Sequence, residues 1–300
     1  MSTSAVALES RRATWVGRLA DYVELTKPKI AALVLVTVAV SALVARWGQP
    51  DPFVLCHALL GTLLVAASAS ALNQWIERRR DALMDRTAAR PLPAGRLRAG
   101  EVLAFGAATL IAGVAYLALA VNVTAAAVGL LTWLLYVALY TPLKSYTWLN
   151  TPVGAVAGAM PVLIGWAASG ASLDLRAAAL FLVVYLWQFP HFMAIAWIYR
   201  RQYDRAGMQM LTVVDPSGRR AAVQAVLAAT ALLPVSLVPA LVAPTAAWYV
   251  ILALILGVGY LACALAFWAR ISESTARLLL RASLVYLPSL LAVWVAAPFL

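Results

Sequence analysis

The sequence predicts an all-α protein that crosses a membrane nine times. Of its 300 residues, 64% are hydrophobic and only 12% are charged, and the mean hydropathy is +0.87. A soluble domain has about 45–50% apolar and about 25% charged residues, so this composition excludes a soluble globular protein. The apolar residues are also grouped into runs long enough to cross a bilayer as helices, which takes roughly 20 residues each.

Nine such runs set the predicted order of transmembrane helices. They cover residues 30–47, 54–75, 100–121, 124–142, 152–170, 175–199, 220–243, 246–268 and 279–299. Only Asn122 and Val123 separate the third run from the fourth, which predicts a tight helical hairpin. Residues 1–29 lack the apolar core of a cleavable signal peptide. We therefore expect a cytoplasmic segment over residues 1–29 and a single transmembrane domain over residues 30–300.

The basic residues predict the orientation of this domain. The chain has 23 Lys and Arg against 12 Asp and Glu, and only Arg46 and Arg176 fall on the side opposite the N-terminus. Basic loops face the cytoplasm, so we expect a cytoplasmic N-terminus and an outer C-terminus in the cell inner (plasma) membrane. The basic residues lie between apolar runs, so the net charge of +11 does not indicate nucleic-acid binding.

Polar residues follow the second run at a helical spacing. If the helix continues, Asn73, Glu77 and Asp81 lie on one face, each four residues from the next. Oxygen ligands at this spacing suit Mg²⁺, which binds through one or two carboxylates and substrate phosphates. A solvated cytoplasmic loop with mixed charges is the alternative. The amide of Asn73, at the end of an apolar span, favours the metal site.

Basic side chains near this stripe provide donors for phosphate oxygens. Five arginines lie between residues 78 and 90, and a Pro-Leu-Pro sequence then stops the helix. This stop would hold Arg86 and Arg90 near the mouth of a cavity, where guanidinium groups bind phosphate well. Lys144 is the single basic residue of the loop after the fourth run and is a further candidate phosphate ligand.

His191 lies inside the sixth run, where a polar side chain is costly and a functional role is the first hypothesis. A structural histidine that is simply hydrogen-bonded to a neighbour is the alternative. Several aromatic residues surround it in the sequence: Tyr185, Trp187, Phe189, Phe192 and Trp197. They predict either an interfacial belt, a pocket for a large flat ligand, or a shield for a carbocation.

Together these stretches resemble the UbiA-type intramembrane prenyltransferases and, among them, the protohaem IX farnesyltransferase (haem o synthase) family. The matching pieces are Leu25-Thr-Lys-Pro-Lys29, Asn73-x3-Glu77-x3-Asp81-Ala-Leu-Met-x-Arg86-Thr-x2-Arg90-Pro-Leu-Pro-x-Gly95, Tyr140-Thr-Pro-Leu-Lys144, Gly158-Ala-x-Pro161-x2-Ile-Gly165-Trp166, Trp187-Gln-x-Pro-His-Phe192 and Tyr203-x2-Ala-Gly207. Beyond about residue 210 the chain agrees with the family only in hydropathy.

This resemblance implies a UbiA-like bundle and a specific reaction. A farnesyl group would pass from farnesyl diphosphate to a vinyl group of protohaem IX (haem b), with addition of water, giving haem o and diphosphate. The implied cofactor is Mg²⁺ and the surroundings are the lipid bilayer. Haem a synthase and assembly proteins of a haem–copper oxidase are candidate partners.

The resemblance also assigns roles to residues. Metal binding falls to Asn73, Glu77 and Asp81, which count as catalytic together with Arg86 and Arg90, and Asp204 is a candidate further ligand. Diphosphate binding falls to Lys27, Lys29, Arg86, Arg90 and Lys144. Haem binding falls to His191 and Trp187.

One departure concerns the acid that the family carries immediately before Tyr203. Here that position is Gln202, with Asp204 on the other side of the tyrosine. Two residues correspond to about 200° of helix, so Asp204 replaces the missing acid only if the local backbone is not helical.

Three other functions stay open on the sequence. A prenyltransferase for an aromatic or chlorin acceptor would share the acidic motif but lack the Pro-His-Phe element. A secondary transporter would place its carboxylates near the bilayer midplane, whereas these acids cluster at one surface. A non-catalytic assembly factor would not need the diphosphate-binding groups.

Overall fold

The computed structural model describes residues 15–47, 49–242 and 247–296, and within these ranges the secondary structure is helical without strands. Nine helices in the described ranges are long and apolar enough to cross a membrane. The predicted number of spans is therefore confirmed. Residues 1–14 of the N-terminal segment and the predicted run ends at 243, 246 and 297–299 lie outside the described residues.

The first six spans alternate in direction between the two ends of the bundle. They are α3 (Pro28–Ala45), α4 (Pro52–Asp81), α5 (Ala99–Ala120), α6 (Val123–Trp133) with its extension, α8 (Asn150–Ala168) and α9 (Leu175–Ile198). The extension of α6 consists of a π-helical segment η1 (Leu134–Tyr140) and the turn α7 (Thr141–Leu143). The short α10 (Arg200–Arg205) and α11 (Leu211–Val214) follow α9.

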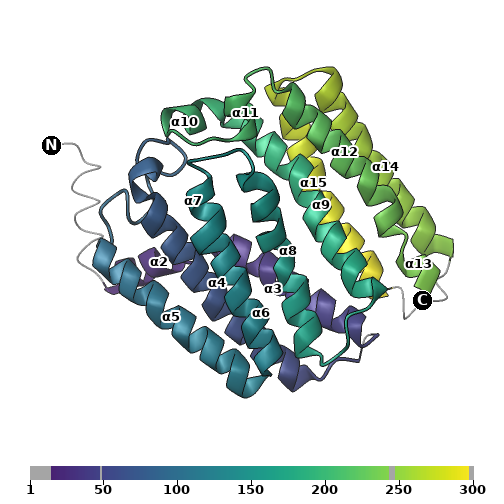
Figure 1. Cartoon of the computed structure of the whole chain (residues 1–300), viewed down its shortest axis with the longest axis horizontal. Coiled ribbons are helices and arrows are strands. Elements are labelled where there is room, and N and C mark those ends of the chain that lie inside the picture. Colours follow the sequence, from purple (N-terminus) through teal and green to yellow (C-terminus); the bar gives the residue numbers. More distant parts are fainter. Residues whose placement is uncertain (1–14, 48, 243–246, 297–300) are drawn as a thin grey trace.

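The last three spans close the bundle. They are α12 (Arg219–Ser236), which is followed by α13 (Pro239–Val242), then α14 (Ala247–Ala269) and α15 (Glu273–Ala296). Each span packs on its neighbours, and α15 contacts both α9 and α3, so the end of the chain returns to its first span. Helix α8 lies at the centre of the arrangement and contacts α3, α4, α6 and α9 (Figure 1).

Helix α4 begins at a well-capped N-terminus. Asp51 caps its N-terminus by accepting hydrogen bonds from the backbone N–H groups of Phe53 and Val54, and Pro52 occupies the first turn. The helix then continues to Asp81, beyond the predicted run end at residue 75. The helix is therefore unbroken through Asp81, as the predicted polar stripe of Asn73, Glu77 and Asp81 on one face requires.

The hairpin between α5 and α6 forms as the sequence predicts. Asn122 caps α6 by accepting a hydrogen bond from the backbone N–H of Ala125, at 2.8 Å. Its amide nitrogen donates to the carbonyl of Ala167 in α8, at 2.9 Å. One polar residue thus starts α6 and attaches the hairpin to the central helix.

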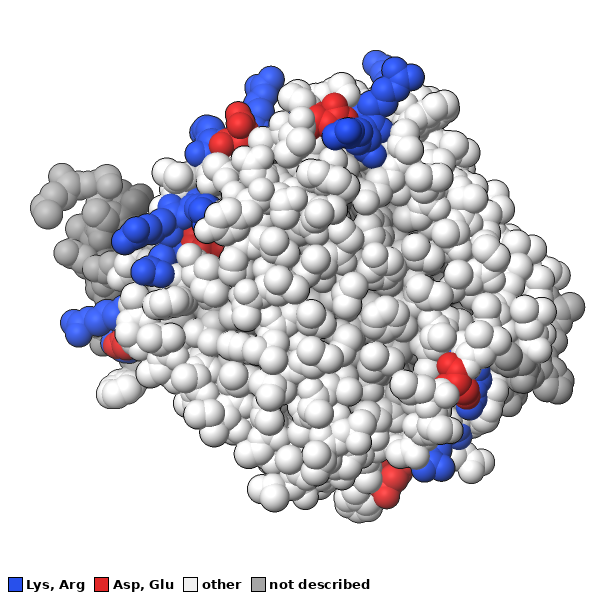
Figure 2. Space-filling model, viewed as in Figure 1, with Lys and Arg blue, Asp and Glu red and all other residues white. Residues whose placement is uncertain are grey.

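The connecting segments give the two ends of the bundle different characters. Helices α10 and α11 lie at one end together with the segment 82–98 that follows α4, while α13 lies at the other (Figure 1). On the face shown in Figure 2, most Lys, Arg, Asp and Glu lie at the first end, a few lie at the other, and a wide uncharged band separates them. This band is what the hydrocarbon core of a bilayer requires, and the chain is a multi-pass membrane protein.

A helix that the sequence did not predict precedes the first span. Helix α2 (Trp15–Leu25) exposes Trp15, Val16 and Leu19 to 89%, 77% and 66%. Large apolar side chains this exposed, beside a charged surface, are typical of a helix that lies in the membrane interface.

Two single-cysteine variants test the orientation. In a background without Cys56 and Cys263, Leu83→Cys should react with a membrane-impermeant maleimide from the cytoplasmic side and Arg46→Cys from the outer side. The reason is that position 83 lies in the basic segment after α4 and position 46 ends α3 at the other end of the bundle. Both positions are exposed, so reaction of both from the same side would contradict the nine-span topology.

Candidate functional site

The polar stripe of α4 is buried in the bundle. Asn73, Glu77 and Asp81 are only 1%, 5% and 0% exposed, although they lie in the last turns before a charged loop. Their spacing of four residues puts them on one face of the helix, as the sequence predicts. Burial of two carboxylates requires partners, and the neighbouring segments supply them.

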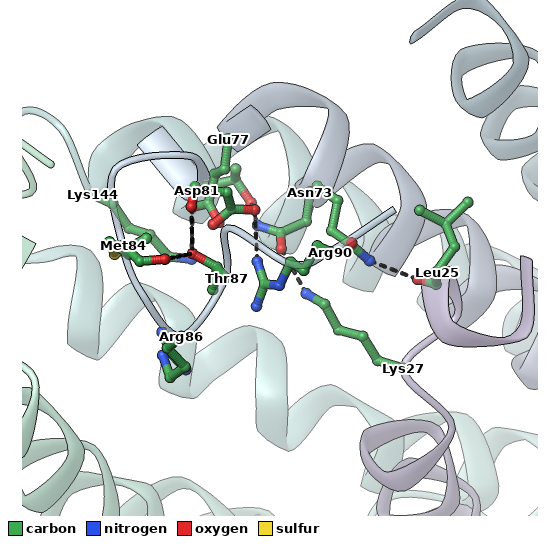
Figure 3. Close-up of polar contacts among 12 residues, drawn as sticks. Leu25, Lys27, Asn73, Glu77, Asp81, Met84, Arg86, Thr87, Arg90 and Lys144 are labelled. Carbon is green, nitrogen blue, oxygen red and sulfur yellow. Dashed lines mark hydrogen bonds and ion pairs between the residues drawn. The ribbon is translucent and has the colours of Figure 1, made fainter. Parts of the chain in front are cut away.

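Each member of the stripe has its own basic partner (Figure 3). The Nζ of Lys27 donates to Oδ1 of Asn73 at 2.8 Å. Lys144 Nζ lies 2.8 Å from Oε1 of Glu77, and a guanidinium nitrogen of Arg90 donates to Oδ2 of Asp81 at 2.7 Å.

Three segments that are distant in the sequence deliver these cations. Lys27 precedes α3 with a left-handed backbone (φ 51°), and Pro28 begins that helix. Lys144 follows α7, and Arg90 lies in the segment after α4. That segment turns back on the helix because the hydroxyl of Thr87 donates to the carbonyl of Asp81 at 2.8 Å.

The π-helical segment η1 helps to aim Lys144 and to hold Asn73. Its wider turn lets the carbonyl of Tyr136 accept from both the backbone N–H and the hydroxyl of Thr141. The Thr141 oxygen in turn accepts from the amide of Asn73 at 3.1 Å. Lys144 lies 4.5 Å from the ring centroid of Tyr140. A π-helical turn often marks a functional site, and here it adjoins the polar stripe.

Burial and neighbouring charge set the proton affinity of the two lysines. Burial, together with the positive charges of Arg90 and Lys144, lowers the pKa of Lys27 to about 7. Burial alone would also lower the pKa of Lys144, but the carboxylate of Glu77 outweighs it and raises that pKa above its ordinary value. Lys144 is therefore a fixed cation, whereas Lys27 changes charge near neutral pH.

One cavity joins this polar cluster to the predicted haem-binding residues. It has a volume of about 390 Å³. At the polar cluster its lining includes Lys27, Asn73, Glu77, Asp81, Arg86, Arg90, Lys144 and Tyr203. From α9 and α15 its lining includes Trp187, Gln188, His191, Phe192 and Leu287. The structure thus brings the acidic motif and the Pro-His-Phe element to one space.

The segment after α9 packs on the segment after α4 at the edge of this cavity, where Arg86 and Tyr203 belong to the lining. A nitrogen of Arg86 donates to the hydroxyl of Tyr203 at 3.2 Å, and its guanidinium lies 4.9 Å from the ring centroid of Tyr199. The backbone N–H of Arg86 donates to the amide oxygen of Gln202 at 3.3 Å. An exposed ion pair between Asp85 and Arg205 adds a further link, at 3.1 Å. Gln202 therefore binds the segment after α4.

Two predicted residues are not brought into the cavity. Lys29 is exposed and points outside the lining. Asp204 is exposed on α10, which is helical, while its neighbour Tyr203 is buried. The geometric condition under which Asp204 would replace the acid missing at Gln202 is therefore not met.

The sequence assigned no role to some residues of the site. Tyr136 and Thr141 act through the π-helical turn, and a change of helical pitch leaves no clear mark in hydropathy. Gln188 lies against Gly158, where an added Cβ would collide with the Oε1 atom of Gln188. The polar residue within a Trp-Gln-x-Pro-His-Phe motif was a usable signal for Gln188, whereas the close approach to glycine depends on how α8 and α9 pack.

The donor set of α4 fits a hard divalent cation. Among the described residues no three His, Cys, Asp or Glu side chains gather into a group, so the available set is two carboxylates and one amide. Asp81 Oδ1 is buried without a hydrogen-bond partner in the described part of the chain. An unpartnered, buried carboxylate oxygen is costly and is suited to a cation ligand, because Mg²⁺ binds oxygen.

A family model for the UbiA prenyltransferase family matches residues 34–295. The chain belongs to this family. Among its curated relatives, a protein of Solibacter usitatus is 46% identical over 277 residues, covering 89% of this chain and 95% of the relative. A protein of Rhodopirellula baltica is 45% identical over 280 residues, covering 90% and 97%. Both relatives are named protoheme IX farnesyltransferase.

Solved structures agree with the fold at lower identity. A digeranylgeranylglyceryl phosphate synthase gives a TM-score of 0.77 at 18% identity, over 93% of this chain and 98% of that one. A UbiA homologue of Archaeoglobus fulgidus, solved with DMAPP and Mg²⁺, gives 0.64 at 18% identity, over 91% and 98%. These likenesses establish a UbiA fold.

The lowered pKa of Lys27 predicts proton uptake when a diphosphate binds. Above pH 7 the free site holds Lys27 partly as the neutral amine, and an anion favours the ammonium form. Affinity for a prenyl diphosphate should therefore fall as pH rises from 7 to 9, with a proton taken up on binding. Calorimetry in buffers of different ionisation enthalpy measures this uptake.

Lys27→Arg provides the control, because guanidinium stays protonated. The difference in proton uptake between wild type and this variant removes the ionisation of the diphosphate itself. Equal proton uptake by the two proteins across this pH range would contradict the assignment.

Proposed function

We propose that this protein transfers the farnesyl group of farnesyl diphosphate to a vinyl carbon of protohaem IX, with addition of water, giving haem o and diphosphate. The single observation that carries the proposal is the cavity whose lining joins Asn73, Glu77 and Asp81 to Trp187 and His191. The relatives named protoheme IX farnesyltransferase support the choice of substrates, because they match this chain over nearly their whole length.

The polar end of the cavity would bind the diphosphate. Lys27, Arg90 and Lys144 converge there from three segments, and Arg86 lies at the mouth. These groups would neutralise the negative charge that grows on the leaving group. In a site shielded from water, such electrostatic stabilisation is usually the largest catalytic contribution.

Mg²⁺ is the proposed cofactor at this end. Asn73, Glu77 and Asp81 would hold it, and the unpartnered Oδ1 of Asp81 is the atom that best fits this role. When bound, the ion would supply Lewis-acid stabilisation of the diphosphate oxygens. The homologue of Archaeoglobus fulgidus solved with DMAPP and Mg²⁺ supports this pairing.

The chemical step follows from these positions. The bond between the farnesyl carbon and the diphosphate oxygen breaks, and both electrons leave with the oxygen. The allylic cation accepts the π electrons of the vinyl group, so a carbon–carbon bond forms. The cation that results beside the porphyrin ring then takes up water and releases a proton to solvent. The aromatic lining can stabilise both cations through their π faces.

The other end of the cavity would bind the acceptor. Trp187 and His191 lie one helical turn apart on α9, and their rings stack with centroids 5.0 Å apart and 27° between planes. A flat porphyrin can lie along such a surface, and an imidazole nitrogen can contact its iron. Diphosphate binding should survive the loss of this imidazole, because the basic groups come from other segments.

The proposed location is the cell inner membrane, with the N-terminus in the cytoplasm and the C-terminus outside. The asymmetry of the basic residues supports this orientation, and it puts the mouth of the cavity on the cytoplasmic side. A transporter is less consistent with the acids, which lie at the end of α4 and not at mid-membrane. A different prenyl acceptor is less consistent with the names of the relatives.

Mass spectrometry of extracted haem tests the reaction directly. Membranes that contain the protein, supplied with haem b and farnesyl diphosphate, should yield a haem heavier by one farnesyl group plus water. Membranes with the inactive variant described next serve as the control. A prenylated product with no change in the haem mass would instead support a different acceptor.

Asp81→Asn should lower turnover by at least ~10²-fold, the range seen when a single electrostatic group of a catalytic site is removed. The substitution keeps the volume, removes one charge and leaves Arg90 without its partner. Asn73→Ala should have nearly the same effect. The matched control is Asp85→Asn, because Asp85 is exposed and, among the described residues, its ion pair is with Arg205.

Haem o formation, with membrane insertion checked in parallel, is the measurement. Near-normal turnover of Asp81→Asn at ordinary Mg²⁺ concentration would overturn the metal assignment.

The exposed position of Asp204 predicts that Asp204→Asn leaves the Mg²⁺ requirement unchanged. Gln202→Glu should lower the Mg²⁺ concentration for half-maximal activity, since it adds a carboxylate beside the segment that follows α4. Titration of activity with Mg²⁺ measures both effects. A sharp rise in the requirement of Asp204→Asn would show that α10 rearranges to bring this carboxylate to the metal.

A further inference from the structure

A serine of the last span contacts the histidine of the cavity. The Nδ1 of His191 lies 2.8 Å from Oγ of Ser283, which is fully buried on α15. The two residues are 92 positions apart, and Ser283 belongs to the part of the chain where the sequence showed only hydropathy. The contact therefore links the predicted haem-binding residue to a helix with no assigned role.

The second contact of this serine determines the direction of the hydrogen bond. Oγ of Ser283 also lies 2.6 Å from the carbonyl oxygen of Leu280. A carbonyl only accepts, and a hydroxyl has one hydrogen to give. If that hydrogen pointed to His191, two oxygens would lie 2.6 Å apart without a proton between them. The hydroxyl therefore donates to Leu280 and accepts from the Nδ1–H of His191.

This direction selects one tautomer of the neutral imidazole. With the proton on Nδ1, the other nitrogen, Nε2, carries a lone pair. His191 lines the cavity, and within the described residues its ring nitrogens have the Ser283 contact as their hydrogen bond. A neutral imidazole that presents a lone pair is the form that binds iron, and the group that holds the opposite N–H usually fixes its orientation.

Ser283 also binds a second residue of the cavity wall. The indole N–H of Trp187 donates to the carbonyl oxygen of Ser283 at 2.7 Å. Trp187 also stacks on His191, so both rings are attached to one residue of α15. The carbonyl of Trp187 accepts from the hydroxyl of Tyr260 at 3.2 Å, which extends the support to α14.

We propose that Ser283 is a positioning residue that holds His191 in the Nδ1–H tautomer, so that Nε2 faces the cavity as a ligand for the iron of the porphyrin acceptor. The inference rests on the proposed function, because it needs haem in this cavity. Without the hydroxyl, the Nδ1–H loses its acceptor in a buried place. The ring can then lower its free energy by moving the proton to Nε2 or by rotating. Either change removes the Nε2 lone pair from the iron.

The test uses the full-length protein in lipid nanodiscs, titrated with ferric haem b. Ser283→Ala should weaken haem binding by about 10–100-fold, as loss of a group that orients a metal-binding histidine typically does. The iron–histidine stretch in the resonance Raman spectrum of the ferrous complex should also weaken or shift. Affinity for farnesyl diphosphate should stay unchanged. Ser283→Thr, which keeps the hydroxyl, should retain both haem affinity and spectrum.

Ser236→Ala is the matched control for loss of a buried serine. Ser236 is also fully buried and also donates to a carbonyl three residues earlier, that of Leu233, at 2.9 Å. It lies on α12 and is not part of the cavity lining. Its replacement should leave haem affinity and spectrum as in the wild type, so a general loss of packing is separated from the effect of Ser283.

A double-mutant cycle separates positioning from general stability. Once His191→Ala has removed the imidazole, adding Ser283→Ala should not weaken haem binding further. If the two losses add, Ser283 acts independently of His191 and the proposal fails. The proposal also fails if Ser283→Ala alone leaves the affinity and the iron–histidine signal unchanged.

These outcomes are distinct from failure of the proposed function. If His191→Ala leaves the haem spectrum unchanged, the assignment of His191 to the iron is wrong, whatever Ser283 does. If His191→Ala abolishes the signal and Ser283→Ala does not, only the role of Ser283 is overturned. Absence of haem o from the wild-type reaction, with normal haem spectra, would contradict the proposed chemistry alone.

Discussion

Neutralisation of buried charge at the end of α4 is the constraint on which the rest of the structure depends. Glu77 and Asp81 are almost fully buried, and a carboxylate without a partner in such a place costs several kcal/mol. Lys144 and Arg90 provide the compensating charges at 2.8 and 2.7 Å. The segments that carry these cations must therefore return to α4, and this requirement fixes the arrangement of the end of the bundle at which α4 ends.

The ion pairs Lys144–Glu77 and Arg90–Asp81 also explain how the site could bind its ligands. Each cation that now compensates a carboxylate is a donor that a diphosphate can use, and each carboxylate is a ligand that a divalent cation can use. In the proposed reaction, the carboxylates of Glu77 and Asp81 would hold the metal ion, and Lys144 and Arg90 would bind the diphosphate. Because the ion and the diphosphate carry opposite charges, the total charge of the buried cluster would stay close to balance. Lys27 differs, because its bond is to the neutral Asn73 and its proton affinity is low enough to respond to an anion.

Departures from regular helix put the functional groups where they are needed. The π-helical turn at residues 134–140 leads directly into Thr141, whose hydroxyl oxygen accepts a hydrogen bond from the amide of Asn73. The left-handed backbone at Lys27 turns the chain directly before α3. Each departure is held by contacts to another element, which is the usual condition for retaining an unfavourable backbone conformation. The cavity thus depends on irregular positions supported by a regular bundle.

The sequence by itself determined the number of spans, because the thickness of the bilayer sets the length of an apolar helix. It also determined the shared face of Asn73, Glu77 and Asp81, since the period of the helix relates residues four apart. Its motifs indicated the family that the comparison establishes. These properties are local or periodic, so they can be recognised without knowing how the helices pack.

Tertiary structure decided which side chains meet. Lys27 joins the cluster and Lys29 does not, because the turn before α3 aims them differently. Asp204 points away from the cavity because α10 is helical. The sequence alone could not establish whether this segment is helical. Ser283 reaches His191 because α15 packs beside α9. Such contacts depend on the rotation and depth of whole helices, and these are set by packing between segments far apart in the chain, which hydropathy and spacing do not record.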